Sequence, residues 1–260
     1  LDDESQITQI GNEKITDVKG DISFKDVWFA YNDEDWVLKG LSLDVKSGES
    51  LALVGATGAG KTSVINLLSR FYEYSKGSIA LDGQDIRNIN TSDLRNHVGV
   101  VLQDVFLFSD TVHNNITINN KEITREQVIE AAKAVGAHEF IMKLPNDYDY
   151  NVRERGAMLS AGQRQLISFI RAYVYNPAIL ILDEATSSID TESEEIIQHA
   201  ISKLTENRTS IIIAHRLATI QRATTILVMD AGKVVEHGSH TELLAKNGFY
   251  KNLFELQFAE

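Results

Sequence analysis

The sequence predicts an α/β fold with a mostly parallel sheet. Short apolar segments of strand length alternate with segments whose apolar residues recur at helical spacing, which is the pattern of strands joined by helices. Two strand-like segments near the N-terminus indicate a hairpin, and the middle of the chain is helical in pattern. We therefore expect an antiparallel part and a helical part added to a parallel core.

The first half of the chain supplies strands and one helix. Residues 1–20 are polar and acidic without periodicity, and we interpret them as a linker or tail. The acidic turn at 32–35 separates the first two strands. The predicted elements are strands at 22–31, 37–45 and 50–55, a helix at 61–72, and strands at 77–83 and 98–103.

The second half begins with helices. The pattern becomes helical from about Thr124, and a later helix stops before Pro177, which cannot continue it. Buried-type strands and a hairpin that turns at 230–232 follow. The predicted elements are helices at 125–136 and 162–176, strands at 178–185 and 209–216, and the hairpin at 224–238.

Composition bounds the classes of function. The 260 residues are 43% apolar, which is enough for a sizeable core, and no apolar run approaches the roughly 18 residues of a membrane span. There is no signal-peptide pattern. The net charge of −12, from 25 basic and 37 acidic residues, argues against a general nucleic-acid surface. The absence of cysteine removes disulfides and cysteine metal sites.

The segment GATGAGKT, residues 55–62, matches G-x-x-x-x-G-K-[ST] in full between a predicted strand and a predicted helix. Glycines let backbone N–H groups turn toward phosphate oxygens, and the helix N-terminus adds a partial positive charge. Lys61 can reach the outer phosphates, and the Thr62 hydroxyl can ligate Mg²⁺. The candidate phosphate-binding residues are Gly55, Thr57, Gly58, Ala59, Gly60, Lys61, Thr62 and Ser63.

Two adjacent acids follow the apolar strand ILIL at 179–182. Ligands of α/β sheets bind at such strand ends, and an aspartate in this position holds Mg²⁺ in P-loop enzymes. We therefore expect Asp183 to be a metal ligand. Glu184, the next residue, can act as a general base for water.

A second helix start with anion-binding character lies at LSAGQ, residues 159–163. Ser160 can cap the helix and offer a hydroxyl, and Gly162 permits close approach of the backbone. The helix after it carries apolar residues along one face, which can anchor it by packing. Taken alone, this segment is an ordinary N-capped helix, so its interpretation depends on the other motifs.

Together these motifs resemble the nucleotide-binding domain of ATP-binding cassette (ABC) transporters, most of all the exporter type. The resemblance covers about residues 21–258. LSAGQ is similar to the family signature LSGGQ, and GATGAGKT and ILILDE are similar to the two Walker motifs. The further matches are Tyr31 for the adenine-stacking aromatic, Gln103 for the Q-loop, residues 187–190 for the D-loop, His215 for the switch histidine, and residues 104–116 and 152–156 for the exporter loops that meet the membrane domain.

The resemblance implies a P-loop NTPase core with a mostly parallel sheet, an N-terminal antiparallel β subdomain and an inserted α-helical subdomain. The nucleotide-binding domain would span 21–260 and the helical subdomain about 104–175. It also implies that two such domains pair head to tail, so that the signature helix of one faces the ATP held by the P-loop of the other. That arrangement explains two anion-binding helix starts in one chain. Ser160, Gly162 and Gln163 would contact the partner's nucleotide.

The resemblance further implies MgATP as the ligand and assigns roles to single residues. Tyr31 would stack on adenine, although a strand tyrosine packed in the hairpin is an alternative. Asp190 would lie at the dimer interface, cap the helix at 191–204, or do both. Glu184, His215 and Gln103 form the implied catalytic set, in which His215 positions the base or the water. The implied metal ligands are Thr62, Gln103 and Asp183.

Departures from the family pattern fall in the part of the chain that would be offered to the partner domain. Ala161 stands in the signature, and Arg153 in the loop before it, where the family usually has glycine; Asn114 and Leu166 also depart. The residues that would hold the chain's own ATP are all present. This unevenness slightly favours a heterodimer, with a different nucleotide-binding domain as the partner, over a homodimer.

The expected function is ATP hydrolysis that drives export through the transmembrane domain of the same transporter. The membrane helices are expected N-terminal to Leu1, and the domain at the cytoplasmic face of the cell membrane, as part of an integral membrane transporter. No nucleic acid is expected as a partner. The alternatives are a soluble ABC ATPase that acts on nucleic acid or ribosomes, and a non-hydrolysing regulatory module, against which Glu184 and His215 argue.

Overall fold

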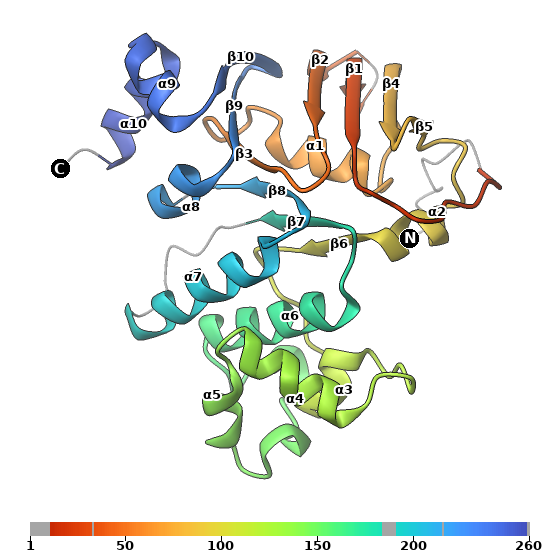
Figure 1. Ribbon diagram of the computed structural model, residues 1–260, viewed down its shortest axis with the longest axis vertical. Helices are drawn as coiled ribbons and strands as arrows, with labels where there is room; N and C mark the ends of the chain where they lie inside the picture. Colours follow the sequence, from red (N-terminus) through yellow and green to blue (C-terminus); the bar gives the residue numbers. More distant parts are fainter. Residues whose placement is uncertain (1–10, 33, 184–190, 215, 259–260) are drawn as a thin grey trace.

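The computed structural model describes residues 11–32, 34–183, 191–214 and 216–258, which form two sheets with helices around them (Figure 1). The strands are β1 (Ile22–Ala30), β2 (Trp36–Val45), β3 (Ser50–Val54), β4 (Lys76–Leu81), β5 (Gln84–Asp85), β6 (Val98–Val101), β7 (Ile179–Asp183), β8 (Thr209–Ile213), β9 (Thr225–Asp230) and β10 (Lys233–Gly238). The helices are α1 (Lys61–Leu68), α2 (Thr91–His97), α3 (Val112–Thr117), α4 (Arg125–Ala134), α5 (His138–Met142), α6 (Ala161–Tyr175), α7 (Thr191–Thr205), α8 (Leu217–Arg222), α9 (His240–Lys246) and α10 (Phe249–Phe258), with single 3₁₀ turns at Asp147–Asp149 and Glu154–Gly156.

The larger sheet has six strands in the order β10-β9-β3-β8-β7-β6. All its pairs are parallel except the β9–β10 hairpin. The smaller sheet, in the order β2-β1-β4-β5, is antiparallel throughout. The predicted fold class, a mostly parallel α/β core with an antiparallel β addition near the N-terminus, is therefore confirmed.

The larger sheet lies between two hydrophobic clusters. Alternate residues of a strand point to opposite faces, so Leu51 and Leu53 of β3 enter one cluster, and Ala52 and Val54 enter the other. The first cluster also takes the apolar residues of α1 and of the smaller sheet. The second takes those of α4, α6 and α7. Helices α3, α4 and α5 gather at the end of the molecule that is far from the smaller sheet (Figure 1).

One predicted element ends earlier than its pattern indicated. The helix expected over 61–72 stops at Leu68, and Phe71 is 47% exposed instead of packed on a helical face. The reason is tertiary: Arg70, with φ at 49°, leaves the helix and buries its guanidinium. There its Nη1 donates to the carbonyl oxygens of Ile86 and Ile89, at 3.0 and 3.1 Å.

The segment interpreted as a linker packs on the domain from residue 11 onward. Ile15 is buried in the cluster of the smaller sheet, and its backbone N–H donates to Asp93 on α2. The proposed boundary at residue 21 stays a prediction. None of the described helices is both long enough and apolar enough to cross a membrane.

Candidate functional site: a phosphate loop and a second helix start

The loop 55–60 joins β3 to α1, and it leaves the start of α1 open. Gly60 is the N-cap residue, in a left-handed conformation with φ at 100°, and among the described residues no side chain caps this helix. The first N–H groups of α1 therefore have no side-chain acceptor in the part of the chain that the structure describes. A helix start with unsatisfied N–H groups and a partial positive charge is suited to an anion.

Gly55 brings this loop close to β9. A Cβ at Gly55 would lie 2.2 Å from the backbone carbonyl oxygen of Met229, a separation that the backbone cannot tolerate. The predicted need for glycine at this end of the loop thus has a specific cause. The loop is pressed against the strand beside β3, and only a residue without a side chain fits there.

Lys61 is held inside the loop and is only 8% exposed. Its Nζ donates to the carbonyl oxygens of Gly55 at 2.7 Å and Ala56 at 3.0 Å. Burial lowers the pKa of Lys61, and the negative charge of Asp183 opposes this shift. The electrostatic interaction brings together two residues that the sequence assigned to one site, the P-loop lysine and the acid at the end of β7.

Two of the three candidate metal ligands lie at or beyond the ends of parallel strands, and the third, Thr62, is the second residue of α1. Asp183 is the last residue of β7, and Gln103 follows β6 by two residues. Since β6 and β7 are parallel neighbours, their carboxyl ends lie at the same edge of the sheet. Gln103 and Thr62 are exposed, and Asp183 is half-buried, so all three side chains are accessible to a ligand to some degree.

Tyr31 follows β1 directly and reaches α1 of the core. Its hydroxyl lies 3.1 Å from Ser63 Oγ and accepts a hydrogen bond from Asn66 Nδ2 at 3.1 Å. Its ring packs edge-to-face with Phe29 and Tyr72. The hairpin-packing alternative thus describes part of its environment, while the half-buried ring keeps the stacking role open.

The second helix start, at α6, is closed by its own residues. Ser160 is the N-cap: its Oγ accepts from the N–H of Gln163 at 3.2 Å, and Gln163 Oε1 accepts from the N–H of Ser160 at 3.0 Å. This capping box satisfies two donors reciprocally. Ser160 and Ala161 are exposed, whereas Gly162 is buried. The methyl group of Ala161 therefore lies on the outer side of the helix start.

The loop before α6 carries backbone strain. Arg153 has φ 63° and ψ −174°, a region that is essentially restricted to glycine, and Arg155 has φ 51° and ψ 21°. Both side chains are exposed. The position at which the sequence departs from the family's glycine is thus also one at which the backbone retains a glycine conformation.

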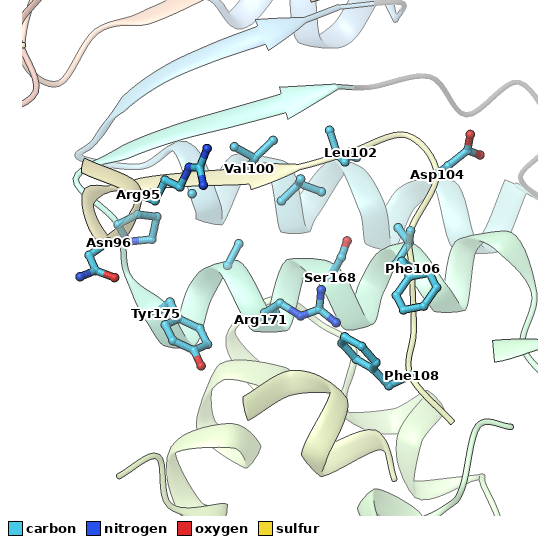
Figure 2. Close-up of a pocket in the computed structure, with 15 residues that line it drawn as sticks. Arg95, Asn96, Val100, Leu102, Asp104, Phe106, Phe108, Ser168, Arg171 and Tyr175 are labelled. Atoms are coloured by element: carbon cyan, nitrogen blue, oxygen red, sulfur yellow. The ribbon is translucent and has the colours of Figure 1, made fainter. Parts of the chain in front are cut away.

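A groove of about 650 Å³ lies between β6, the loop after it and α6 (Figure 2). Leu102, Phe106 and Phe108 line it and are 50%, 55% and 52% exposed. Arg171 and Tyr175 of α6 form the facing wall, as Figure 2 shows. The result is an apolar surface with cationic groups beside it.

The groove is held in shape by a buried asparagine that belongs to none of the predicted site residues. Asn115 on α3 accepts from the N–H of Phe108 at 2.7 Å and donates to its carbonyl oxygen at 3.0 Å. Arg171 in turn donates from Nε and Nη2 to the carbonyl oxygen of Asn115, at 3.0 and 2.9 Å. Asn115 lies in a segment, 104–116, where polar and apolar residues are mixed, so its residue type alone gave no sequence signal for this role.

Three predicted parts of the site lie outside the described residues: Glu184, His215 and the segment 187–190. The described parts lie on two faces of the sheet. Helix α1 packs into the cluster with the smaller sheet and α6 into the opposite cluster. Their two starts are thus separate features of the domain.

These features define a P-loop nucleotide-binding domain: a parallel sheet, an uncapped helix start after a glycine loop, and an acid at the end of a nearby strand. The model of the family described as "ABC transporter" matches residues 38–187. The chain belongs to the ABC transporter family, as an ATP-binding domain of the ATPase type.

Relatives and a solved structure agree with this assignment. The chain is 48% identical over 238 residues, or 92% of its length, to YheH of Bacillus subtilis (strain 168), named provisionally as a multidrug resistance ABC transporter ATP-binding/permease protein. It is 48% identical over 249 residues, or 95% of its length, to SAOUHSC_02003 of Staphylococcus aureus (strain NCTC 8325 / PS 47), named provisionally as a multidrug export ATP-binding/permease protein. A bacterial Atm1-family ABC exporter with ATP bound is 40% identical and superimposes on the whole chain with a TM-score of 0.91.

The chain spans only part of these proteins. It covers 35% and 43% of the two relatives and 46% of the exporter chain. The activity, substrates and partners of a whole transporter are therefore matters for proposal.

Proposed function

We propose that this chain binds MgATP at the loop 55–62, pairs head to tail with a second nucleotide-binding domain and hydrolyses ATP to drive export through a transmembrane domain. One observation carries this proposal. The uncapped start of α1 holds a buried Lys61 whose charge interacts with Asp183. A phosphate chain at this start would meet N–H groups, the lysine and a metal-binding acid together.

The residues present fit a magnesium ion. Carboxylate, hydroxyl and amide oxygens are ligands that Mg²⁺ accepts, usually alongside phosphate oxygens and water. Asp183, Thr62 and Gln103 would hold it, and a bound Mg²⁺ neutralises charge that develops on the phosphates. Lys61 would exchange the carbonyl oxygens of Gly55 and Ala56 for phosphate oxygens, because its donors are already directed into the loop.

The hydrolytic step needs a base and a positioned water. Glu184 follows the metal-binding Asp183 in the chain and takes the proton of the water in this proposal. His215 holds the γ-phosphate and the water, and Gln103 links them to the loop after β6. The signature residues Ser160, Gly162 and Gln163 complete the ATP site of the partner domain.

The groove between β6 and α6 is our candidate contact with the transmembrane domain. Its exposed Leu102, Phe106 and Phe108 suit an apolar helix or loop, and exposed aromatic side chains are enriched where proteins associate. Permease segments in the names of relatives support a membrane partner. On this basis the domain works at the cytoplasmic face of a membrane, and an ATPase acting on nucleic acid or ribosomes is not favoured.

The second nucleotide-binding domain is either a copy of this chain or a different one, and we slightly favour a different one. The exposed methyl group of Ala161 lies at the start of α6, where the partner's nucleotide would approach. In a heterodimer, that change and Arg153 affect only one of the two ATP sites.

The test is the Glu184→Gln variant, which keeps the shape of the side chain and removes its basicity. Removing a general base typically lowers a rate about 10²- to 10⁴-fold. ATP binding, measured by titration calorimetry, is expected to persist while phosphate release falls by that factor, and size-exclusion chromatography with ATP is expected to show a dimer. Glu195→Gln, at an exposed position of α7, is the control. Hydrolysis near the wild-type rate in Glu184→Gln would refute the assignment.

A further inference from the structure

Tyr31 is tied by its hydroxyl to the same helix whose start forms the phosphate site. Asn66 Nδ2 donates to Tyr31 Oη at 3.1 Å, and Ser63 Oγ lies 3.1 Å from the same oxygen. Ser63 and Asn66 are three residues apart on α1 and therefore share one face of it. Because Tyr31 Oη accepts from Asn66, its own proton is available for Ser63.

The ring of Tyr31 is also restrained by its neighbours. The centroid of Phe29 lies 4.7 Å away at an interplanar angle of 77°, and that of Tyr72 lies 4.9 Å away at 89°. Edge-to-face pairs at these separations are favourable. Two ring contacts and two polar contacts at the para position determine both the tilt of the ring and its distance from α1.

The contacts between Tyr31 and α1 are not explained by phosphate binding. Asn66 belongs to neither Walker motif, and Ser63, only 4% exposed, directs its hydroxyl to Tyr31. A flat base gains most from a ring that is already oriented, because less conformational freedom is then lost on binding. Since Lys61 and Asn66 belong to one short helix, the distance between the phosphate end and the base end of the site is set by α1.

We infer that Asn66, together with Ser63, is a positioning residue that orients Tyr31 for the base of the nucleotide. The inference rests on the proposed function, in which Tyr31 stacks on adenine. It predicts that Asn66 contributes to the affinity for a ligand that carries a base, and contributes nothing for the phosphate chain alone.

The experiment compares the binding of MgADP and of inorganic tripolyphosphate by titration calorimetry. Asn66→Ala is expected to weaken MgADP about 2- to 10-fold, which is the range for one lost hydrogen bond, and to leave tripolyphosphate unchanged. Tyr31→Phe keeps the ring and removes the hydroxyl with its contacts to both Asn66 and Ser63, so it should weaken MgADP at least as much. The double variant should be no weaker than Tyr31→Phe, because that variant already lacks the Asn66 bond.

Control variants separate this inference from the function on which it rests. Asn252→Ala, at an exposed position of α10, should bind both ligands normally. Lys61→Ala should weaken both ligands, which identifies the phosphate site. If Tyr31→Ala leaves MgADP binding unchanged while Lys61→Ala weakens it, the stacking role is wrong and the phosphate site stands.

Three results would overturn the positioning role: unchanged MgADP affinity in Asn66→Ala, an equal loss for tripolyphosphate, or additive losses in the double variant. An equal loss for both ligands would mean that Asn66 only supports the fold of α1. If Asn66→Ala does not fold, Tyr31→Phe alone decides, since it removes a single oxygen atom.

Discussion

The two helix starts of this domain are satisfied in opposite ways. Within the described part of the chain no side chain caps α1, whereas α6 closes its start with the Ser160–Gln163 capping box. An uncapped start keeps its donors for a ligand, and a capped start must share or break bonds to bind one. In the proposed function, the first start therefore takes phosphate by itself, and the second adds contacts to a nucleotide that another domain already holds.

The loops before the two helices also differ in which residues adopt positive φ angles. In the loop before α1 the positive-φ positions are the glycines Gly55, Gly58 and Gly60, which adopt such angles without a steric penalty. In the loop before α6 they include Arg153 and Arg155. The cost of such conformations is of order 1–3 kcal/mol each for residues other than glycine. The first loop is relaxed and the second is strained.

The largest effect should come from Lys61→Ala, which removes the cation of the first start. Loss of one preorganised donor to a reacting group typically lowers turnover about 10²- to 10³-fold. Phosphate release at saturating ATP is the measurement, with the exposed Lys46→Ala as the control. Turnover within a few-fold of the wild type would mean that the start of α1 is not the phosphate site.

Gly60→Ala should strain the relaxed loop. The backbone at residue 60 has φ at +100°, and the added Cβ would lie 2.8 Å from Leu38 Cδ2. We therefore expect the free energy of unfolding to fall by about 1–2 kcal/mol. Denaturant unfolding measures this change. At Gly48, also at positive φ, a Cβ would enter open space among the described residues, so Gly48→Ala should cost less. Equal costs at the two positions would contradict the close approach to Leu38.

Ser160→Ala opens the capped start. Removing an N-cap side chain costs about 1 kcal/mol, which corresponds to a Tm lower by about 2–4 °C in a domain of this size. Ser239→Ala is the matched control, because Ser239 and Glu242 form the same capping box on α9. Both variants should have a lower Tm, but only Ser160→Ala should also slow ATP turnover. A slowing of turnover by both would remove any special role for the start of α6.

Arg153→Gly should give the smallest change, and of opposite sign. Glycine adopts the observed backbone angles without strain but gains freedom in the unfolded chain. We therefore expect a net stabilisation of about 0.5–1 kcal/mol, visible as a small rise in Tm. A fall in Tm would show that contacts of the arginine side chain outweigh its backbone strain.

The sequence predicted best what depends on neighbours along the chain. The phosphate loop, the capped start of α6 and the strands of the larger sheet follow from local motifs and apolar patterns. The end of α1 could not be predicted, because Arg70 leaves the helix for carbonyl oxygens about 16 to 19 residues away. The groove was missed for a similar reason: its walls come from β6 and α6, which are far apart in the chain.

The alternation of residues in the central strands has a consequence for how the domain fails. Leu51 and Leu53 serve one hydrophobic cluster, and Ala52 and Val54, one position along the strand, serve the other. Heat or denaturant that loosens one face of β3 withdraws support from the opposite face at the same time. The domain should therefore melt in a single cooperative step, with equal calorimetric and van't Hoff enthalpies. A partly unfolded state with an intact groove and an unfolded nucleotide site would not accumulate. A protease should therefore cleave only the fully unfolded chain.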